Sequence, residues 1–185
     1  GAPVANGQIG ILPWCEPFSI RHIILNHVFE FGPNGDVFRV VKAINPFDLI
    51  VRINGTSVNN ENISHWTQSI NLKNATHNTS FTYLNKAKID YTIRALRNLP
   101  FGGLLSINIQ SISDEPLNIE MINMMDVPDG EYLNKKTQYQ FKQFVESHHP
   151  KKKIMSVFSC SSMTKNKSHK ICASSSFRIM DESAE

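Results

Sequence analysis

The octet Lys88-Ile89-Asp90-Tyr91-Thr92-Ile93-Arg94-Ala95 alternates between polar and apolar side chains at every position. Because successive side chains of a β-strand point to opposite faces, this period of two places the apolar members on one face: Ile89, Tyr91, Ile93 and Ala95. The stretch from Ser106 to Ile112 continues the alternation with its isoleucines. One buried face and one wet face are typical of an antiparallel sheet, so these stretches predict an all-β fold.

Strand-like runs of this kind recur along the chain, whereas helical periodicity is scarce. Further runs are Phe38–Val41, Leu49–Ile53, Ser69–Leu72, Thr79–Leu84 and Leu117–Met124. Asn54-Gly55 directly follows one of them, and an Asn-Gly pair after such a run is a strong signal for a tight hairpin. Short strands at this spacing, separated by turns rich in Gly, Pro and Asp, predict a β-sandwich or a barrel.

Two features of the C-terminal part bear on domain organisation. Lys135–Glu146 carries apolar side chains at helical spacing, and a helix and a strand fit these residues equally well. Beyond it, Ile154–Ser161 and Lys170–Ile179 flank a polar turn and predict a second hairpin. The chain of 185 residues is expected to form a single β-sandwich domain, residues 1–185, with this tail hairpin at residues 154–180.

Composition excludes several classes of protein. Apolar residues make up 41% and charged residues 19%, which suffices for a core and is too little charge for a disordered chain. The longest apolar runs are about five residues, far short of what a membrane-spanning helix needs, so no membrane span is expected. The excess positive charge lies in residues 131–185, with 10 basic and 5 acidic side chains. Nearly all of the basic ones are Lys, which favours solvated turns, and no nucleic-acid partner is predicted.

The tail hairpin holds two of the three cysteines. Cys160 and Cys172 lie nearly symmetrically about its turn. If the register places them directly opposite, they are close enough for a disulfide, whereas a slip of one residue points their side chains to opposite faces. A Cys160–Cys172 bridge is therefore a hypothesis, with two unpaired thiols as the alternative. His169 lies between them, but structural zinc sites need four ligands at paired short spacings, so neither a metal nor a cofactor is predicted.

The sequence gives little support to catalysis by this chain. Cys15 lacks the surroundings of a nucleophile, and His22 and His27 are expected to be surface or packing residues. The acidic residues gather in turns such as Asp114-Glu115 and Asp126–Glu131, where turn formation explains them. Glycoside hydrolysis needs two carboxylates held across a cleft, and nothing in the pattern indicates such a pair. No catalytic residue is assigned.

Aromatic side chains are the remaining candidates for a binding role. Trp66 follows His65 in a polar, Asn-rich stretch, which suits an exposed platform on which a sugar ring stacks. Trp14 is a second candidate, and Tyr83 could extend a platform at Trp66. Trp is equally a common core residue, so both roles stay open for these positions.

The N-terminal sequence resembles the beginning of a domain in a known protein family. The pattern is Asn6-Gly7-Gln8-Ile9-Gly10-Ile11-Leu12, followed by Ile23-Ile24-Leu25-Asn26 and a turn at Gly32–Gly35. It is similar to the start of the N-terminal β-supersandwich domain of glycoside hydrolases of the family 65 and family 95 type, the six-hairpin glycosidases. The runs Val51–Gly55 and Leu104–Ile109 fit the same domain, and the resemblance spans residues 6–125.

This resemblance implies an antiparallel β-supersandwich, galactose-mutarotase-like or a related sandwich, with at most one or two short helices. It also implies that the catalytic carboxylates belong to a separate helical (α/α) barrel in the same parent chain. The expected role is then that of a non-catalytic domain that supports the barrel or completes its cleft. An isolated domain of this kind should expose a large apolar patch, because a sheet with one apolar face must bury it.

Two other classes of function stay open. The first is a stand-alone carbohydrate-binding module that holds an oligo- or polysaccharide on aromatic side chains. The second is a structural or adhesive surface domain, tied by the tail hairpin. The small residues at the start, Gly1-Ala2-Pro3, are typical of a mature end left after a leader is removed, and they predict an exported, periplasmic or cell-surface protein.

Overall fold

A computed structural model describes residues 2–31, 35, 37–128, 138–146, 153–164 and 169–178, with the backbone alone for 138–146 and 153–156. The chain divides into two compact units, residues 1–128 (unit 1) and 129–185 (unit 2). That the two units belong to a single domain stays a prediction.

Unit 1 consists of short strands, with no helix among its described residues. The strands are β1 (Val4–Ala5), β2 (Ile9–Pro13), β3 (Ile20–Phe31), β4 (Phe38–Lys42), β5 (Asn45–Ile53), β6 (Thr56–Ser57), β7 (Ile63–Asn71), β8 (Thr76–Tyr83), β9 (Ala87–Ala95), β10 (Gly103–Ser111) and β11 (Ile119–Asp126). They form three sheets, with the orders β1-β2-β3-β4, β10-β9-β8-β7 and β11-β5-β6. Every pairing is antiparallel, and the predicted all-β class is confirmed.

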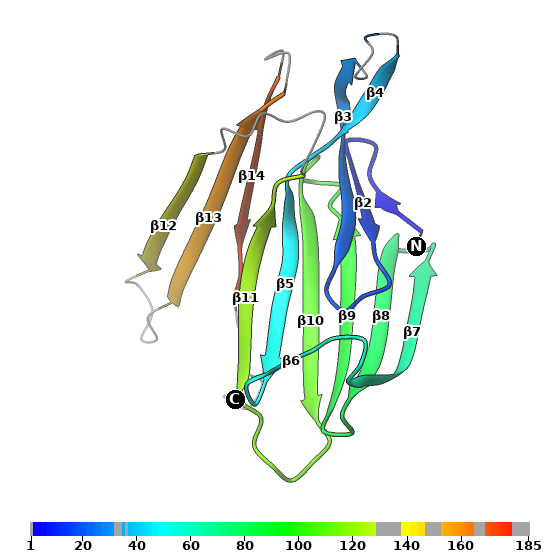
Figure 1. Cartoon of the computed structure of the whole chain (residues 1–185), viewed down its shortest axis with the longest axis vertical. Helices are drawn as coiled ribbons and strands as arrows, with labels where there is room; N and C mark the ends of the chain where they lie inside the picture. Colours follow the sequence, from blue (N-terminus) through cyan, green and yellow to red (C-terminus); the bar gives the residue numbers. More distant parts are fainter. Residues whose placement is uncertain are drawn as a thin grey trace. The chain divides into compact units, whose positions relative to one another are not determined.

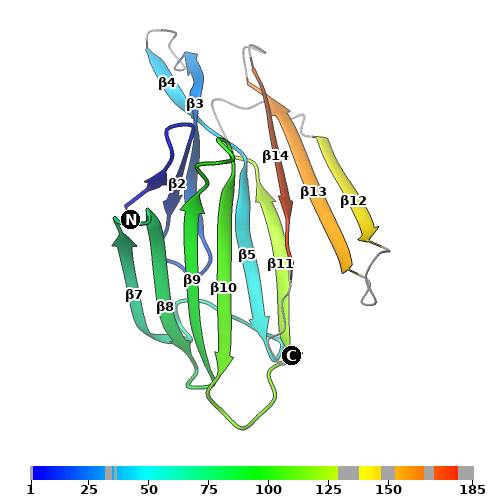
Figure 2. The ribbon, with the colours of Figure 1, turned by 180° about the vertical axis from the view of Figure 1, so that it is seen from behind.

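Two of these sheets pack face to face. The β1–β4 sheet lies against one face of the β7–β10 sheet (Figures 1 and 2), and both β1 and β2 contact β9. The ring of Phe18, in the loop between β2 and β3, contacts Phe81 of β8 and Tyr91 of β9 with centroids 5.9 and 5.1 Å apart. The arrangement is sandwich-like, as the strand pattern predicts.

The alternation in the sequence of β9 decides which of its faces is buried. Ile89, Tyr91 and Ile93 are at most 2% exposed, whereas Lys88 and Arg94 on the other face are exposed. The core continues in further buried side chains of unit 1: Val4, Ile9, Ile11, Ile20, Ile23, Phe81 and Tyr83. Burial of this apolar surface is the main free-energy gain that holds the two layers together.

The predicted hairpin at Asn54-Gly55 is present. These residues have φ values of 51° and 80° between β5 and β6. A left-handed conformation at both central residues is what a type I′ turn requires and what Asn-Gly favours. The longer pairing of β5 is with β11 on its other edge, from Ile53 opposite Ile119 onward.

Unit 2 contains a further antiparallel sheet, in the order β12-β13-β14. Its strands are β12 (Gln138–Glu146), β13 (Lys153–Met163) and β14 (Lys170–Ser176). The helix considered for Lys135–Glu146 is wrong for residues 138–146, because they pair with β13 throughout, and residues 135–137 lie outside the described residues. β13 and β14 form a hairpin whose turn, 165–168, also lies outside them.

Replacement of Phe81 tests whether the interface between the two layers holds unit 1 together. Phe81 is 1% exposed, and its ring contacts Phe18, Trp66 and Tyr91. Phe81→Ala should lower the free energy of unfolding by about 3–5 kcal/mol in urea denaturation of the 185-residue chain. The neighbouring residue supplies a matched control: Thr82→Ala should cost less than about 1 kcal/mol. Equal losses for the two variants would contradict this account of the core.

Candidate functional site

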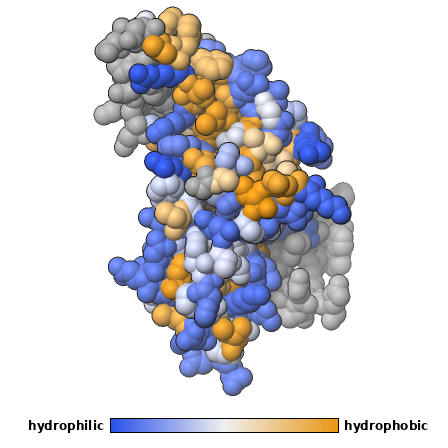
Figure 3. Space-filling view, turned by 90° about the vertical axis from the view of Figure 1, so that its right-hand side faces the viewer, coloured by the Kyte–Doolittle hydropathy of each residue, from blue (hydrophilic) through white to orange (hydrophobic). Residues whose placement is uncertain are grey.

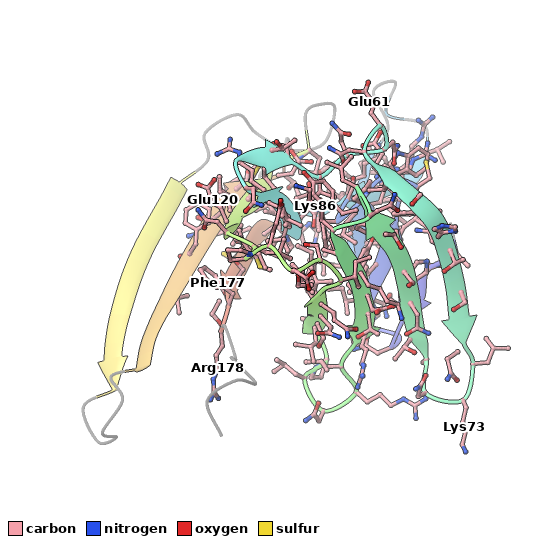
Figure 4. The ribbon with its side chains drawn as sticks, turned by 90° about the horizontal axis from the view of Figure 1, so that it is seen from below. Glu61, Lys73, Lys86, Glu120, Phe177 and Arg178 are labelled. Carbon is pink, nitrogen blue, oxygen red and sulfur yellow. The ribbon has the colours of Figure 1, made fainter. Side chains whose placement is uncertain are left out.

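An open hollow of about 320 Å³ lies on unit 1 between the β2–β3 loop and the loop after β6. Its lining is Glu16, Pro17, Val58, Asn59, Asn60 and Glu61. Side chain–backbone bonds shape the second loop: Asn59 Oδ1 accepts from the N–H of Glu61 at 3.0 Å, and Asn62 Oδ1 accepts from the N–H of Asn59 at 2.9 Å. The carboxylate of Glu61 points outward from the loop (Figure 4).

The hollow offers polar groups without the features of a glycosidase centre. Glu16 and Glu61 are both exposed, whereas the general acid of a glycosidase is kept protonated by apolar burial. Its lining residues include no aromatic side chain on which a sugar could stack. Binding pockets for small molecules are mostly apolar and enclose most of the ligand. This hollow is open and most of its lining residues are polar, so what it offers a ligand is hydrogen bonds.

Trp66 lies inside β7, at a bulge, and not in a loop between strands. The β7–β8 register shifts between Ser64 and Thr67, and His65 has a φ of 54°. The indole of Trp66 stacks on Phe81, with 5.5 Å between centroids and 23° between the planes. One ring face is therefore covered by the core, and the side chain is half-buried.

Burial excludes Tyr83 as an extension of a platform at Trp66, whereas Trp14 has one ring face covered and stays a separate candidate. The guanidinium of Arg21 lies 4.2 Å from the centre of the Trp14 ring and covers one of its faces. Tyr83 is 2% exposed, so a sugar ring cannot stack on it. The reason is the alternation along β8, which turns Tyr83 to the same buried face as Phe81.

Cys160 and Cys172 lie on neighbouring strands but are offset by one position. Cys160 pairs with Ala173, and Cys172 pairs with Ser161. The two side chains therefore point to opposite faces, Cys160 buried and Cys172 exposed, and both thiols are free. Burial, and to a lesser degree the nearby Cys172, raises the pKa of the Cys160 thiol. The hypothesised Cys160–Cys172 bridge is not formed, because the β13–β14 register is offset by one residue and keeps the two side chains on opposite faces.

Burial shifts the pKa of several groups in unit 1. It lowers the pKa of His77 on β8. It raises the pKa of Asp48, which accepts a hydrogen bond from the N–H of Ile20 at 3.0 Å. It also raises the pKa of Tyr91, whose hydroxyl accepts from the N–H of Phe18 at 3.3 Å. Shifted pKa values can mark a catalytic centre, but these groups lie on core strands and none of them lines the hollow.

Among the residues whose placement is described, no group of three or more His, Cys, Asp or Glu side chains could hold a metal ion. The same residues contain no helix long and apolar enough to cross a membrane. His148 and His149, upstream of the tail hairpin, lie outside the described residues.

Asn6, the first residue of the N-terminal motif, joins the two layers of unit 1. Its Nδ2 donates to the carbonyl oxygens of Leu96 at 2.6 Å and Pro100 at 2.8 Å, both in the β9–β10 loop. Its Oδ1 accepts from the N–H groups of Gln8 and Ile9 at 2.9 and 3.0 Å. One amide therefore closes the β1–β2 turn and links it to the opposite sheet.

Asn26, at the other end of the motif, binds the same turn. Its N–H donates to the carbonyl oxygen of Gln8 at 2.8 Å, and its Nδ2 donates to that of Gly7 at 2.9 Å. Gly7 has a φ of 91°, which glycine adopts without strain. The polar residues of this motif thus fix the first strands in place, and their role in this chain is structural.

The fold and these contacts define unit 1 as a sandwich-like arrangement of antiparallel sheets. No protein-family model matches the chain. The chain is 29% identical over 148 residues to a kojibiose hydrolase of Flavobacterium johnsoniae, and 28% identical over 130 residues to a kojibiose hydrolase of Mucilaginibacter mallensis.

The two matches cover 80% and 70% of this chain but only 21% and 19% of those relatives. The chain therefore spans about a fifth of the length of the curated relatives it matches. It is similar to one part of glycoside hydrolases, in agreement with the resemblance of its N-terminal motif.

Asn6→Asp tests the structural role of the motif. The substitution keeps the oxygen that accepts from Gln8 and Ile9 and removes both donors to the β9–β10 loop. The partly buried carbonyl oxygen of Leu96 and the exposed one of Pro100 then face a carboxylate, so the free energy of unfolding should fall by about 2 kcal/mol in urea denaturation. Asn98→Asp adds the same charge at an exposed position of that loop and should change stability by less than about 0.5 kcal/mol. Equal effects of the two substitutions would exclude the link.

Proposed function

We propose that this chain is the N-terminal, non-catalytic sandwich domain of a glycoside hydrolase, and that the parent protein acts on kojibiose or a related glucoside. The catalytic carboxylates belong to a separate (α/α) barrel of the same parent chain. The sandwich supports that barrel or completes its cleft. This division of labour assigns no chemical step to the residues of this chain.

The observation that carries this proposal is the extent of the similarity. Most of this chain matches kojibiose hydrolases, yet the match covers about a fifth of each relative. Most of the polypeptide of each relative therefore lies outside the part similar to this chain. The exposed positions of Glu16 and Glu61 agree with catalysis by residues elsewhere in the parent.

The placement of the aromatic residues weakens the alternative of a stand-alone carbohydrate-binding module. Trp66 stacks on Phe81, Arg21 covers Trp14, and Tyr83 is buried. The outward positions of β9 carry Lys88, Asp90, Thr92 and Arg94 and no aromatic ring. A flat platform for stacked sugars needs several exposed aromatic faces side by side, and the burial of Tyr83 removes the expected neighbour of Trp66.

We also propose that the parent protein is exported to the periplasm or the cell surface. This proposal rests on the resemblance of the N-terminal motif, residues 6–26, to glycoside hydrolases. Fractionation of the source cells, followed by immunoblotting, tests it: the protein should leave with the periplasmic or surface fraction, and recovery with the cytosol would contradict export.

Assays with kojibiose test the proposed function. The parent polypeptide should release glucose, whereas the 185-residue chain alone should release none above the buffer blank. Calorimetric titration of the chain alone with kojibiose should show no binding.

Two results would contradict the proposal. Hydrolysis of kojibiose by the 185-residue chain would make it an enzyme in its own right. Binding that is lost in Trp66→Ala and kept in Phe101→Ala, the matched change at an exposed aromatic residue, would favour the binding module. Thermal unfolding of both variants shows whether the first substitution merely unfolds the sandwich.

A further inference from the structure

The outer half of β3 and the strand β4 form a two-stranded hairpin, to which no third strand pairs among the residues that the structure describes. β2 pairs with β3 no further than Leu25, opposite Ile9. Beyond a bulge at His27, where φ is 64°, β3 pairs with β4 from Phe29 to Phe31. This hairpin extends past the end of the sandwich (Figures 1 and 2).

One face of the hairpin is apolar and exposed. Phe29 lies opposite Val40, and Phe31 lies opposite Phe38, with the last two rings 4.0 Å apart. We call these four side chains the hairpin face. Their exposed fractions are 42% for Phe29, 44% for Val40, 45% for Phe31 and 63% for Phe38. Apolar atoms gather at the upper end of the molecule in Figure 3, where Figure 1 places β3 and β4.

A face of this kind is unfavourable unless something covers it. An isolated two-stranded hairpin is marginally stable in water and gains stability by packing its apolar face on another element. Three phenylalanines and a valine at one spot are also more than the scattered surface apolar residues of a soluble protein, and such patches mark interaction sites.

The size of the hairpin face indicates what covers it. A stable interface between separate proteins takes roughly 20–30 residues from each side, and this face offers four side chains on two strands. A contact that small is sufficient when the partner belongs to the same polypeptide, because tethering gives it a high effective concentration. The relatives are long enough to supply such a partner, since this chain spans about a fifth of their length.

We propose that the hairpin face docks on an apolar surface of the remaining polypeptide of the parent chain. This inference rests on the proposed function, because it requires a parent longer than this chain, and it adds the surface that joins the sandwich to its partner. Phe38, the most exposed of the four, lies at the centre of this contact.

Hydroxyl-radical footprinting of the parent polypeptide and of the 185-residue chain tests the docking. Phe38 should be oxidised about fivefold more slowly in the parent, as its exposed fraction falls from 63% to that of a buried side chain. Leu72, 89% exposed in the turn between β7 and β8, serves as the matched control and should react equally in both.

A pair of charged variants tests the same contact by stability. Phe38→Asp should lower the melting temperature of the parent by more than that of the 185-residue chain, because the chain alone loses the contact with Phe31 and the parent loses the docking contact as well. Leu72→Asp should change neither melting temperature.

Each contrary result overturns a defined part of the account. Equal oxidation of Phe38 in a longer parent and in the chain alone would overturn the docking and leave the proposed function intact. A parent no longer than this chain would overturn both. If Phe38 is protected from oxidation in the chain alone and dilution removes that protection, a second copy of the chain covers the face. If the protection is the same at every concentration, unit 2 covers it. Either result overturns the proposal.

Discussion

The structure of unit 1 depends on one constraint, which is that the apolar face of the β7–β10 sheet must be kept from water. Ile89, Tyr91 and Ile93 present that face on β9, and the sheet that contains β2 covers it. Phe18 closes the contact by reaching both Phe81 and Tyr91. Hydrophobic burial has no direction, however, so it does not by itself fix how the two layers align. The directional bonds of Asn6 to the β9–β10 loop supply that alignment.

The sequence predicts the features that local patterns encode and misses those that depend on distant partners. Alternation predicts the buried face of β9, and Asn54-Gly55 predicts its turn. No local pattern marks the bulge at His65, which places Trp66 against Phe81 instead of in solvent. A one-residue difference in register separates Cys160 from Cys172, and symmetry about a turn is too coarse to detect it.

The same distinction governs the candidate site. A motif at the start of the chain indicates a glycoside hydrolase relative, and the asparagines of this motif bond to backbone groups of neighbouring turns and loops. Fold alone does not define activity. A sandwich domain can serve a protein through the surfaces that it offers for contact. The exposed face of the β3–β4 hairpin is the feature of unit 1 that packing within its sheets leaves unexplained, since Phe31 and Phe38 contact each other and remain accessible. If the domain packs against a neighbouring domain of the same chain, that contact explains both the similarity to part of a glycoside hydrolase and the exposed hairpin face.

The central claim is that this sandwich works as one part of a longer polypeptide. The most direct test is the mass of the native protein in its source cells, measured by immunoblotting with an antibody raised against this chain. We expect a band several times larger than the 20.9 kDa of this 185-residue chain, as the length of the relatives implies. A band at 20.9 kDa would contradict the proposal of a longer parent chain. The function would then have to be sought on the surface of the sandwich itself.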